Sequence, residues 1–374
     1  MQSHHCVKCF NTGLMNNKVK VRLTLEDGTV YWGRSFGAPV TAAGEVVFNT
    51  AMTGYPESLT DPSYKGQILC LTYPLVGNYG APGKSEENDL YSFYESASIH
   101  ISGLIVSDYS FDYSHWNASE SLDEWLKRNG IPGVFGIDTR ALTKRIREEG
   151  AMLGKVEPEG TETGFYDPNK INLVAEVSTR EIKRYGSGKY KIMLVDCGVK
   201  YNIIRNLLKR DTTIIRVPWD YDYHNDDFDG LFLTNGPGDP KMCSKTIENI
   251  KTSFSEDKPI FGICLGNQLM ALASGADTYK LKYGHRSHNQ PVIQAGTDKA
   301  YITSQNHGFA VDNNTLAKDW EPLFININDN TNEGMRHKTR PFFSTQFHPE
   351  ASGGPTDTDY LFDEFIENIQ KTKQ

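Results

Sequence analysis

The chain has 374 residues, enough for two or three domains that each bury a hydrophobic core. Its 47 acidic and 39 basic residues give a formal net charge of −8 without a sustained basic stripe, which argues against a nucleic-acid partner. Hydrophobic residues make up 38% of the chain, and no apolar run approaches the ~20 residues of a membrane-spanning helix, so we expect a soluble protein without a membrane partner.

The cysteines indicate the redox state of the compartment, and residues 1–17 raise the question of a metal site. Six cysteines are scattered through the chain without a disulfide framework, which favours a reducing compartment. Residues 1–17 contain His4, His5, Cys6 and Cys9, but a second pair at zinc-ligand spacing is missing, so no metal site is predicted. This segment lacks apolar periodicity and is expected to be a disordered leader. We expect the cytoplasm as the location, and the acid-free leader leaves an organelle open.

Residues 18–177 are expected to form one N-terminal domain of mixed α and β structure. Two alternating β-rich segments flank Asp27 and Gly28, a dipeptide typical of a β-hairpin turn. Amphipathic helical patterns follow at 121–127 and 139–147.

Residues 178–189 are polar and rich in glycine and are predicted to be a linker. From residue 190 to residue 374 the pattern changes to strand, helix, strand, which predicts a doubly wound parallel sheet with helices on both faces. In such α/β folds, ligands bind at the carboxyl ends of the strands.

Cys264 lies where a short apolar strand passes through the pattern Gly-x-Cys-x-Gly into a helix-forming segment. This is the pattern of a nucleophile elbow, and the N-terminus of the following helix would stabilise a thiolate. Gly262 and Gly266 allow the sharp turn. The alternative is that Cys264 is an ordinary buried core cysteine.

Another strand pattern ends on His348, and Glu350 follows two positions later. A sulfur nucleophile needs a base within hydrogen-bond reach, and the base needs an acceptor that orients it, so Cys264, His348 and Glu350 are predicted to form a catalytic triad. Taken alone, His348 could be a strand-end histidine bonded to backbone, and Glu350 a solvated loop charge.

The turn from Asn235 to Pro240, with the sequence Asn-Gly-Pro-Gly-Asp-Pro, follows another predicted strand. It matches neither a dinucleotide fingerprint nor a phosphate loop. It could be only a tight turn. At a strand end beside the elbow, however, its backbone N–H groups and that of Leu265 could hold the oxyanion of an acyl-transfer intermediate.

Four motifs together resemble the glutaminase domain of class I glutamine amidotransferases: Asn235-Gly-Pro-Gly-Asp-Pro240, Gly262-Ile-Cys-Leu-Gly-x-Gln268, Thr303-Ser-Gln-Asn-His-Gly-Phe309 and Gln346-Phe-His-Pro-Glu350. Motifs of the N-terminal half, such as Gly44-Glu-Val-Val-Phe-Asn-Thr50 and Gly136-Ile-Asp-Thr-Arg-Ala-Leu-Thr143, narrow this to the small subunit of carbamoyl-phosphate synthetase. The resemblance extends from about Lys18 to the C-terminus and is closest to the glutaminase portion of the fused eukaryotic enzyme of pyrimidine synthesis.

The resemblance implies that Cys264 attacks the amide carbon of glutamine to give a glutamyl thioester, while His348 transfers protons and Glu350 orients the imidazole. Ammonia would pass to a large synthetase subunit or domain, separate or fused, that uses bicarbonate and ATP to make carbamoyl phosphate for pyrimidine or arginine synthesis. No cofactor is expected in this chain. The glutamine contacts that the resemblance implies are Ser63, Gly236, Gly238, Leu265, Gln268, Asn306, Gly308 and Phe309.

Because Ser63 lies in the N-terminal half, we expect the site near the domain junction. His307 is a second candidate base. The histidine that usually precedes Gln268 in this family is Asn267 here, and we expect hydrolysis to survive that change.

Two alternatives stay open. One is a different triad glutaminase, such as one for purine or aromatic biosynthesis or a γ-glutamyl hydrolase, against which the N-terminal half argues. The other is a glutaminase-inactive docking or regulatory module of the synthetase. Some mitochondrial relatives have lost the nucleophile, but this chain retains Cys264.

Overall fold

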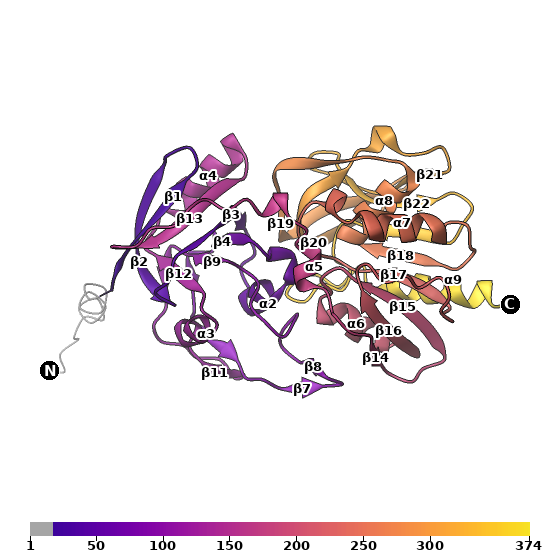
Figure 1. Ribbon diagram of the computed structural model, residues 1–374, viewed down its shortest axis with the longest axis horizontal. Helices are drawn as coiled ribbons and strands as arrows, with labels where there is room; N and C mark the ends of the chain where they lie inside the picture. The colour runs from indigo at the N-terminus through magenta and orange to yellow at the C-terminus, as the bar shows by residue number, and fades with distance from the viewer. Residues whose placement is uncertain (1–17) are drawn as a thin grey trace. The chain divides into compact units, whose positions relative to one another are not determined.

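The structure, a computed structural model, describes residues 18–374; the leader with its His4, His5, Cys6 and Cys9 lies outside the described residues. The described chain divides into two compact units (Figure 1). Unit 1 contains residues 18–48, 66–83 and 101–167, and unit 2 contains residues 49–65, 84–100 and 168–374. Within residues 18–374, every helix is too short or too polar to cross a membrane.

Unit 1 is built on a closed β-barrel. Around the barrel its strands are β1 (Lys20–Leu25), β13 (Met152–Pro158), β3 (Ala42–Asn49), β4 (Gln67–Leu71), β9 (Gly103–Ile105), β12 (Pro132–Phe135) and β2 (Val30–Gly37). Its other elements are β5 (Leu75–Val76), β6 (Ala81–Pro82), β10 (Asp108–Tyr109), β11 (Ala118–Glu120), α3 (Leu122–Arg128) and α4 (Thr139–Glu149).

Several local predictions for unit 1 are confirmed. β1 pairs antiparallel with β2, and the turn between them holds Gly28 at φ +87°, as the Asp27-Gly28 signal predicts. Helix α3 begins with a capping box in which the side chains of Ser121 and Glu124 each bond the other's backbone N–H. Alternate residues of β1 are buried, so the barrel interior is a packed core.

Unit 2 is built on a sheet of ten strands. In spatial order they are β14 (Lys183–Tyr185), β16 (Thr212–Pro218), β15 (Tyr190–Asp196), β17 (Gly230–Leu233), β18 (Ile260–Ile263), β23 (Phe342–Thr345), β22 (Asn332–His337), β21 (Trp320–Asn326), β19 (Thr278–Gln294) and β20 (Ala300–Val311). The α-helices are α2 (Tyr55–Thr60), α5 (Val174–Val177), α6 (Tyr201–Leu208), α7 (Ser244–Ser253), α8 (Leu265–Ser274) and α9 (Tyr360–Thr372). The short elements are η1 (Pro62–Tyr64), β7 (Glu86–Glu87), β8 (Leu90–Tyr91), η2 (Pro168–Lys170), η3 (Pro240–Met242) and η4 (Asn313–Thr315).

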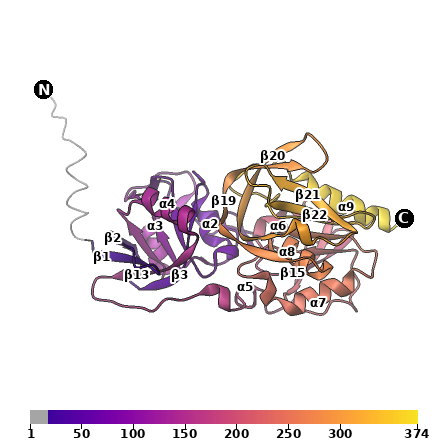
Figure 2. The same ribbon diagram turned by 90° about the horizontal axis from the view of Figure 1, so that it is seen from above.

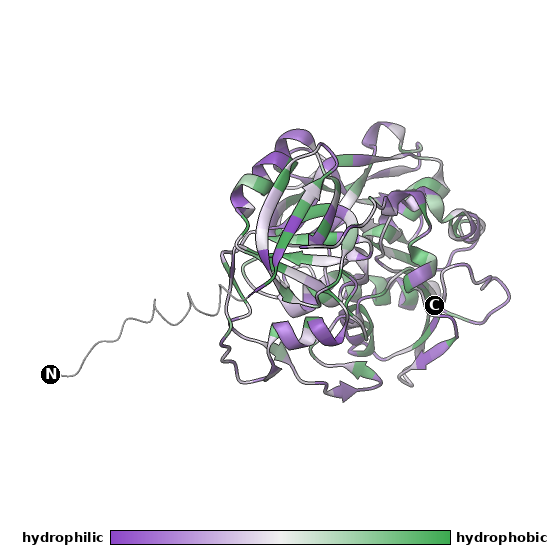
Figure 3. Ribbon diagram, turned by 60° about the vertical axis from the view of Figure 1, so that its left-hand side comes forward, coloured by the Kyte–Doolittle hydropathy of each residue, from purple (hydrophilic) through white to green (hydrophobic). Residues whose placement is uncertain are grey.

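Helices cover both faces of this sheet (Figure 2). Successive side chains of a strand point to opposite faces, and β15 shows the result. Ile192 and Leu194 pack in one core with residues of α6 and α9, whereas Met193 and Val195 pack in another with residues of α7 and α8. In the ribbon coloured by hydropathy, hydrophobic stretches are interrupted by hydrophilic ones along the strands (Figure 3). The predicted doubly wound arrangement is therefore confirmed for the parallel strands β16, β15, β17, β18 and β23.

Three features differ from the prediction. The sheet continues into antiparallel strands at both ends, so it is mixed. The predicted linker at 178–189 contains β14, which pairs with β16, because residues 183–185 supply backbone bonds to an otherwise open sheet edge. Residues 49–65 and 84–100, expected in the N-terminal domain, belong to unit 2. The contacts that these two segments make within unit 2 decide that assignment, and sequence order does not reveal them.

Candidate active site

Cys264 stands at a strained turn between β18 and α8. Its φ of 55° and ψ of −102° lie outside the regions that L-residues favour, as expected of a nucleophile elbow. A Cβ on Gly262 would lie 2.8 Å from Gly266 carbonyl carbon, and a Cβ on Gly266 would lie 2.4 Å from the Leu233 carbonyl oxygen. Both positions therefore require glycine. Cys264 follows the carboxyl end of its strand, and its N–H donates to the Thr345 carbonyl at 2.7 Å.

His348 and Glu350 follow the neighbouring strand β23. Glu350 Oε1 lies 2.7 Å from Nδ1 of His348, and both residues are 2% exposed. Backbone fixes the histidine as well, since its N–H donates to the Ser304 carbonyl at 2.9 Å. Nε2 of His348 has no hydrogen-bond partner among residues 18–374. The ring is therefore oriented through Nδ1 and keeps Nε2 available.

The Cys264 thiol lies 3.7 Å from the Asn306 carbonyl oxygen, at the limit of a sulfur hydrogen bond. Burial alone would lower the pKa of His348, because it disfavours the charged ring. The Glu350 carboxylate has the opposite and larger influence, and Cys264 also raises this pKa, which reaches about 10. The structure thus places Cys264, His348 and Glu350 together, and the Glu350 carboxylate favours the protonated imidazole.

Lys200 completes this cluster, and sequence reasoning missed it. Its ammonium lies 2.9 Å from Glu350 Oε1 and donates to the Ala351 carbonyl at 2.8 Å, while its side chain is 7% exposed. Burial would raise the pKa of Glu350, but Lys200 and then His348 oppose this and lower it to about 2. Lys200 lies just beyond the carboxyl end of β15, so the strand-end rule was the signal that could have found it.

Ser63 and Asn306, two predicted glutamine contacts, join one hydrogen-bonded network. The Asn235 amide donates to Ser63 Oγ at 2.9 Å, and the Asn306 amide donates to Asp61 Oδ2 at 2.9 Å. All four residues belong to unit 2. Ser63 thus belongs to the same compact unit as the elbow, although it lies in the N-terminal half of the sequence, and the expected position of the site near the domain junction stays a prediction. Asn235 and Asp61 were not predicted as site residues.

Gln268 and Phe309, also predicted contacts, bond each other directly behind the elbow. The Gln268 amide donates to the Phe309 carbonyl at 2.9 Å and to Gln346 Oε1 at 3.1 Å. Asn267 donates to the same Gln346 oxygen at 3.1 Å and accepts from Ser344 Oγ at 2.7 Å. Asn267 is fully buried in this network, so its side chain helps to hold the first turn of α8 against the residues at the end of β23.

The remaining predicted contacts are backbone positions. A Cβ on Gly236 would lie 2.1 Å from the Cys197 carbonyl oxygen and 2.8 Å from Leu265 Cδ2, so the turn packs tightly beside the start of α8. Leu265 is the first residue of α8, where N–H groups have no acceptor within the helix. Gly238 adopts φ +83°, and Gly308 lies against the Arg286 side chain. Their use as oxyanion or substrate donors stays a prediction.

A narrow cavity of about 20 Å³ adjoins the site. Its lining includes Asp61, Lys200, Asn306 and His348. This volume holds about one water molecule.

His307, the second candidate base, is engaged elsewhere. Its Nδ1 lies 2.8 Å from the Phe309 carbonyl oxygen, and its Nε2 lies 3.3 Å from Gln305 Oε1. Burial, followed by the charge of His285, holds its pKa well below the usual range. These contacts favour His348 as the base.

Known protein families match both halves of the chain. Residues 193–368 match the glutamine amidotransferase class-I family, and residues 23–156 match the CPSase domain of the carbamoyl-phosphate synthase small chain. The chain is 55% identical to the multifunctional protein CAD of Squalus acanthias, over 94% of this chain and 16% of that protein.

It is 52% identical to the mitochondrial carbamoyl-phosphate synthase (ammonia) of Aquarana catesbeiana, over 96% of this chain and 24% of that protein. It is 50% identical to the carbamoyl phosphate synthase arginine-specific small chain of Debaryomyces hansenii, over 96% of this chain and 88% of that protein. The chain thus spans a quarter or less of the first two relatives and most of the third.

Proposed function

Since the chain belongs to the family of carbamoyl-phosphate synthase small chains, with a class I glutamine amidotransferase domain, we propose that it hydrolyses glutamine to glutamate and ammonia. The observation that carries the proposal is the strained Cys264 elbow beside a His348 ring that Glu350 orients. Acyl transfer needs this set of nucleophile, proton carrier and orienting carboxylate.

The charge state of the cluster suits the first half of the reaction. With His348 protonated, the Cys264 sulfur attacks the side-chain amide carbon of glutamine as a thiolate, and the amide oxygen takes negative charge. The N–H of Leu265 and the Gly236 turn would donate to that oxygen. His348 then gives its Nε2 proton to the leaving nitrogen, so ammonia departs and a glutamyl thioester forms.

In the second half, neutral His348 takes a proton from water as the water attacks the thioester carbon. Collapse of this intermediate releases glutamate, and the proton restores the imidazolium beside the Cys264 thiolate. Lys200 and Glu350 hold a buried ion pair throughout, which keeps the carboxylate charged under the ring. Breaking such a pair would leave an unpaired buried charge.

The ammonia would pass to a synthetase large subunit or domain, separate or fused, that consumes ATP and bicarbonate and makes carbamoyl phosphate for the pyrimidine or arginine pathway. This chain itself would need no cofactor for glutamine hydrolysis. The cytoplasm is the proposed location.

A second candidate is a docking or regulatory module of the synthetase that does not hydrolyse glutamine. The observation that favours it is the 52% identity to a carbamoyl-phosphate synthase whose name specifies ammonia. Asn267, which replaces the family histidine, adds slight support.

Glutamate release from glutamine separates the two candidates. It would be measured for the full chain, for Cys264→Ala and for the control Cys243→Ala, each with and without a synthetase large subunit. Cys243 is also a buried free cysteine of unit 2 but lies at the start of α7. Activity that disappears only in Cys264→Ala supports the glutaminase. Complex formation without hydrolysis under either condition would leave the docking module.

A further inference from the structure

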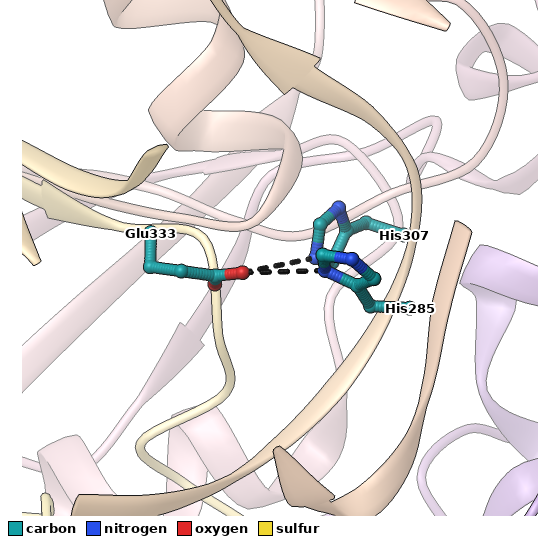
Figure 4. Close-up of side chains that lie close together, drawn as sticks. All are labelled: His285, His307 and Glu333. Atoms are coloured by element: carbon teal, nitrogen blue, oxygen red, sulfur yellow. Dashed lines mark hydrogen bonds and ion pairs between the residues drawn. The ribbon is translucent and has the colours of Figure 1, made fainter. Parts of the chain in front are cut away.

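Three buried side chains converge in unit 2 outside the triad. His285 of β19, His307 of β20 and Glu333 of β22 offer ligand atoms that all lie within 4.8 Å of one another. His285 and His307 are direct partners in the register of β19 and β20, which brings their rings together with centroids 4.9 Å apart. Figure 4 shows both rings facing the Glu333 carboxylate.

Hydrogen bonds on the far side of each ring orient the two imidazoles. Nδ1 of His307 faces the Phe309 carbonyl at 2.8 Å; a carbonyl only accepts, so Nδ1 donates and Nε2 turns its lone pair inward. Nε2 of His285 lies 2.8 Å from Asp329 Oδ2, which leaves Nδ1 facing Glu333. A histidine that donates its outer N–H to a carboxylate or carbonyl is the usual arrangement of a metal ligand.

The interior of the cluster is rich in acceptors. Nε2 of His307 lies 3.3 Å from Gln305 Oε1 and 3.8 Å from Glu333 Oε1. Glu333 is fully buried; its Oε1 accepts from the Asn326 amide at 3.1 Å, and its Oε2 has no hydrogen-bond partner among residues 18–374. An unpaired buried carboxylate oxygen is costly, and a metal ion bound to this group would offset that cost.

The spacing fits a small divalent ion. Tetrahedral zinc binds nitrogen and oxygen at about 2.0–2.2 Å, which places neighbouring ligand atoms about 3.3–3.6 Å apart. Nδ1 of His285 lies 3.3 Å from Glu333 Oε1, and Nε2 of His307 lies 3.8 Å from the same oxygen. Small side-chain adjustments would bring all three atoms onto one ion.

We propose that His285, His307 and Glu333 form a binding site for a divalent transition metal of the zinc type, with Asp329 orienting His285 from outside. The Gln305 amide oxygen or a water molecule supplies the fourth ligand. The ion joins β19, β20 and β22 as a structural clamp. It acts on β20 beside Asn306 and Phe309, but it takes no part in the proton transfers of His348.

Metal binding by the full chain tests the site. The background variant carries Cys264→Ala, so that the elbow thiol cannot bind the ion, and alanine at positions 4, 5, 6 and 9, which removes the leader's histidines and cysteines. After treatment with a chelator, Co²⁺ is titrated while its visible absorption is recorded, and Zn²⁺ is then added in competition. We expect one equivalent of Co²⁺ with the intense spectrum of four-coordinate geometry, displaced by Zn²⁺.

Variants assign the ligands. His285→Asn and Glu333→Gln should each abolish stoichiometric binding, whereas the control His337→Asn, farther along β22, should retain it. Asp329→Asn leaves all three ligands in place and should weaken binding by about 10–100-fold, as the loss of an outer hydrogen-bond partner does. The weaker binding of Asp329→Asn therefore tests the site even if a ligand variant fails to fold.

Three outcomes would overturn the proposal. The first is no stoichiometric Co²⁺ or Zn²⁺ binding by the folded background protein. The second is binding that survives in folded His285→Asn and Glu333→Gln, and the third is undiminished affinity in Asp329→Asn. These readouts do not depend on glutaminase activity, so the metal site and the proposed function can fail separately.

Discussion

Unit 2 contains two buried pairings of imidazole and carboxylate, and they differ in how the carboxylate is compensated. Beside His348, Glu350 has the Lys200 ammonium at 2.9 Å, and its pKa falls to about 2. Beside His285, Glu333 has only histidine side chains as recorded ion-pair partners within residues 18–374, and burial raises its pKa. The Lys200 ammonium fixes the first carboxylate in its charged form, whereas the second carboxylate depends on the neighbouring histidines for compensation.

The largest expected difference between the clusters is in catalysis. His348→Asn should lower kcat for glutamine hydrolysis by about 10²–10⁴-fold, because it removes the group that we propose protonates the leaving nitrogen. His307→Asn should cost at most about tenfold, since that ring bonds Phe309 and Gln305. Steady-state kinetics of both variants would check this. Equal losses would mean that the two histidines do not have separate roles.

Lys200→Met should destabilise unit 2 by about 3–5 kcal/mol, because it leaves the Glu350 charge buried and unpaired. Its exposed counterpart Lys191→Met loses a solvent-screened pair with Asp227 and should leave the urea midpoint unchanged. Urea unfolding of both variants gives the comparison. A midpoint for Lys200→Met like that of the parent would contradict the claim that this cation fixes the cluster.

Acid should distinguish the two carboxylates. The folded pKa of Glu350, about 2, lies below the ordinary value of about 4.3, so its contribution is complete above about pH 5 and is lost as the pH falls through 2. The whole loss is about 3 kcal/mol of unfolding free energy, and about 2 kcal/mol of it should occur by pH 3. Urea unfolding between pH 6 and 3, with chelator present, should show a shallower decline in Glu350→Gln.

Glu333→Gln is the matched control in acid. The pKa of Glu333 is raised in the folded protein, so removing this carboxyl should not make the acid decline shallower. A shallower decline in Glu333→Gln than in Glu350→Gln would reverse the assignment of the compensated cluster.

The smallest effect is expected at Asn267, whose side chain links helix α8 to Ser344 and Gln346 by hydrogen bonds. Asn267→His should change kcat by less than about tenfold, because the position touches Gln346 and Ser344 and not the triad. Parallel assays of Asn267→His and the parent chain would measure it. A loss comparable to that of His348→Asn would show that the buried amide controls the elbow.

Much of the candidate site was predictable because it is encoded locally. Gly262, Cys264 and Gly266 lie within five consecutive residues, and the strand-to-helix turn among them follows from side-chain size and backbone freedom. His348 and Glu350 are two residues apart after one strand, so a single turn of chain brings them into contact. The hairpin at Gly28 and the cap of α3 are likewise local.

The rest was decided by tertiary structure. Lys200 is 150 residues away from Glu350, and Ser63 is 172 residues away from Asn235, so only the order of strands and the packing of residues 49–65 on unit 2 brings them together. The closed barrel and the antiparallel ends of the large sheet depend on pairing between distant strands, which no local pattern specifies.

The sequence by itself therefore predicted the candidate nucleophile and base and determined the helices and strands that present them, because spacing and periodicity act over a few residues. Only the tertiary structure decided which buried charges are compensated. That depends on which distant side chains share a low-dielectric interior. Lys200 pairs with Glu350, whereas within residues 18–374 the ion-pair partners of Glu333 are His285 and His307.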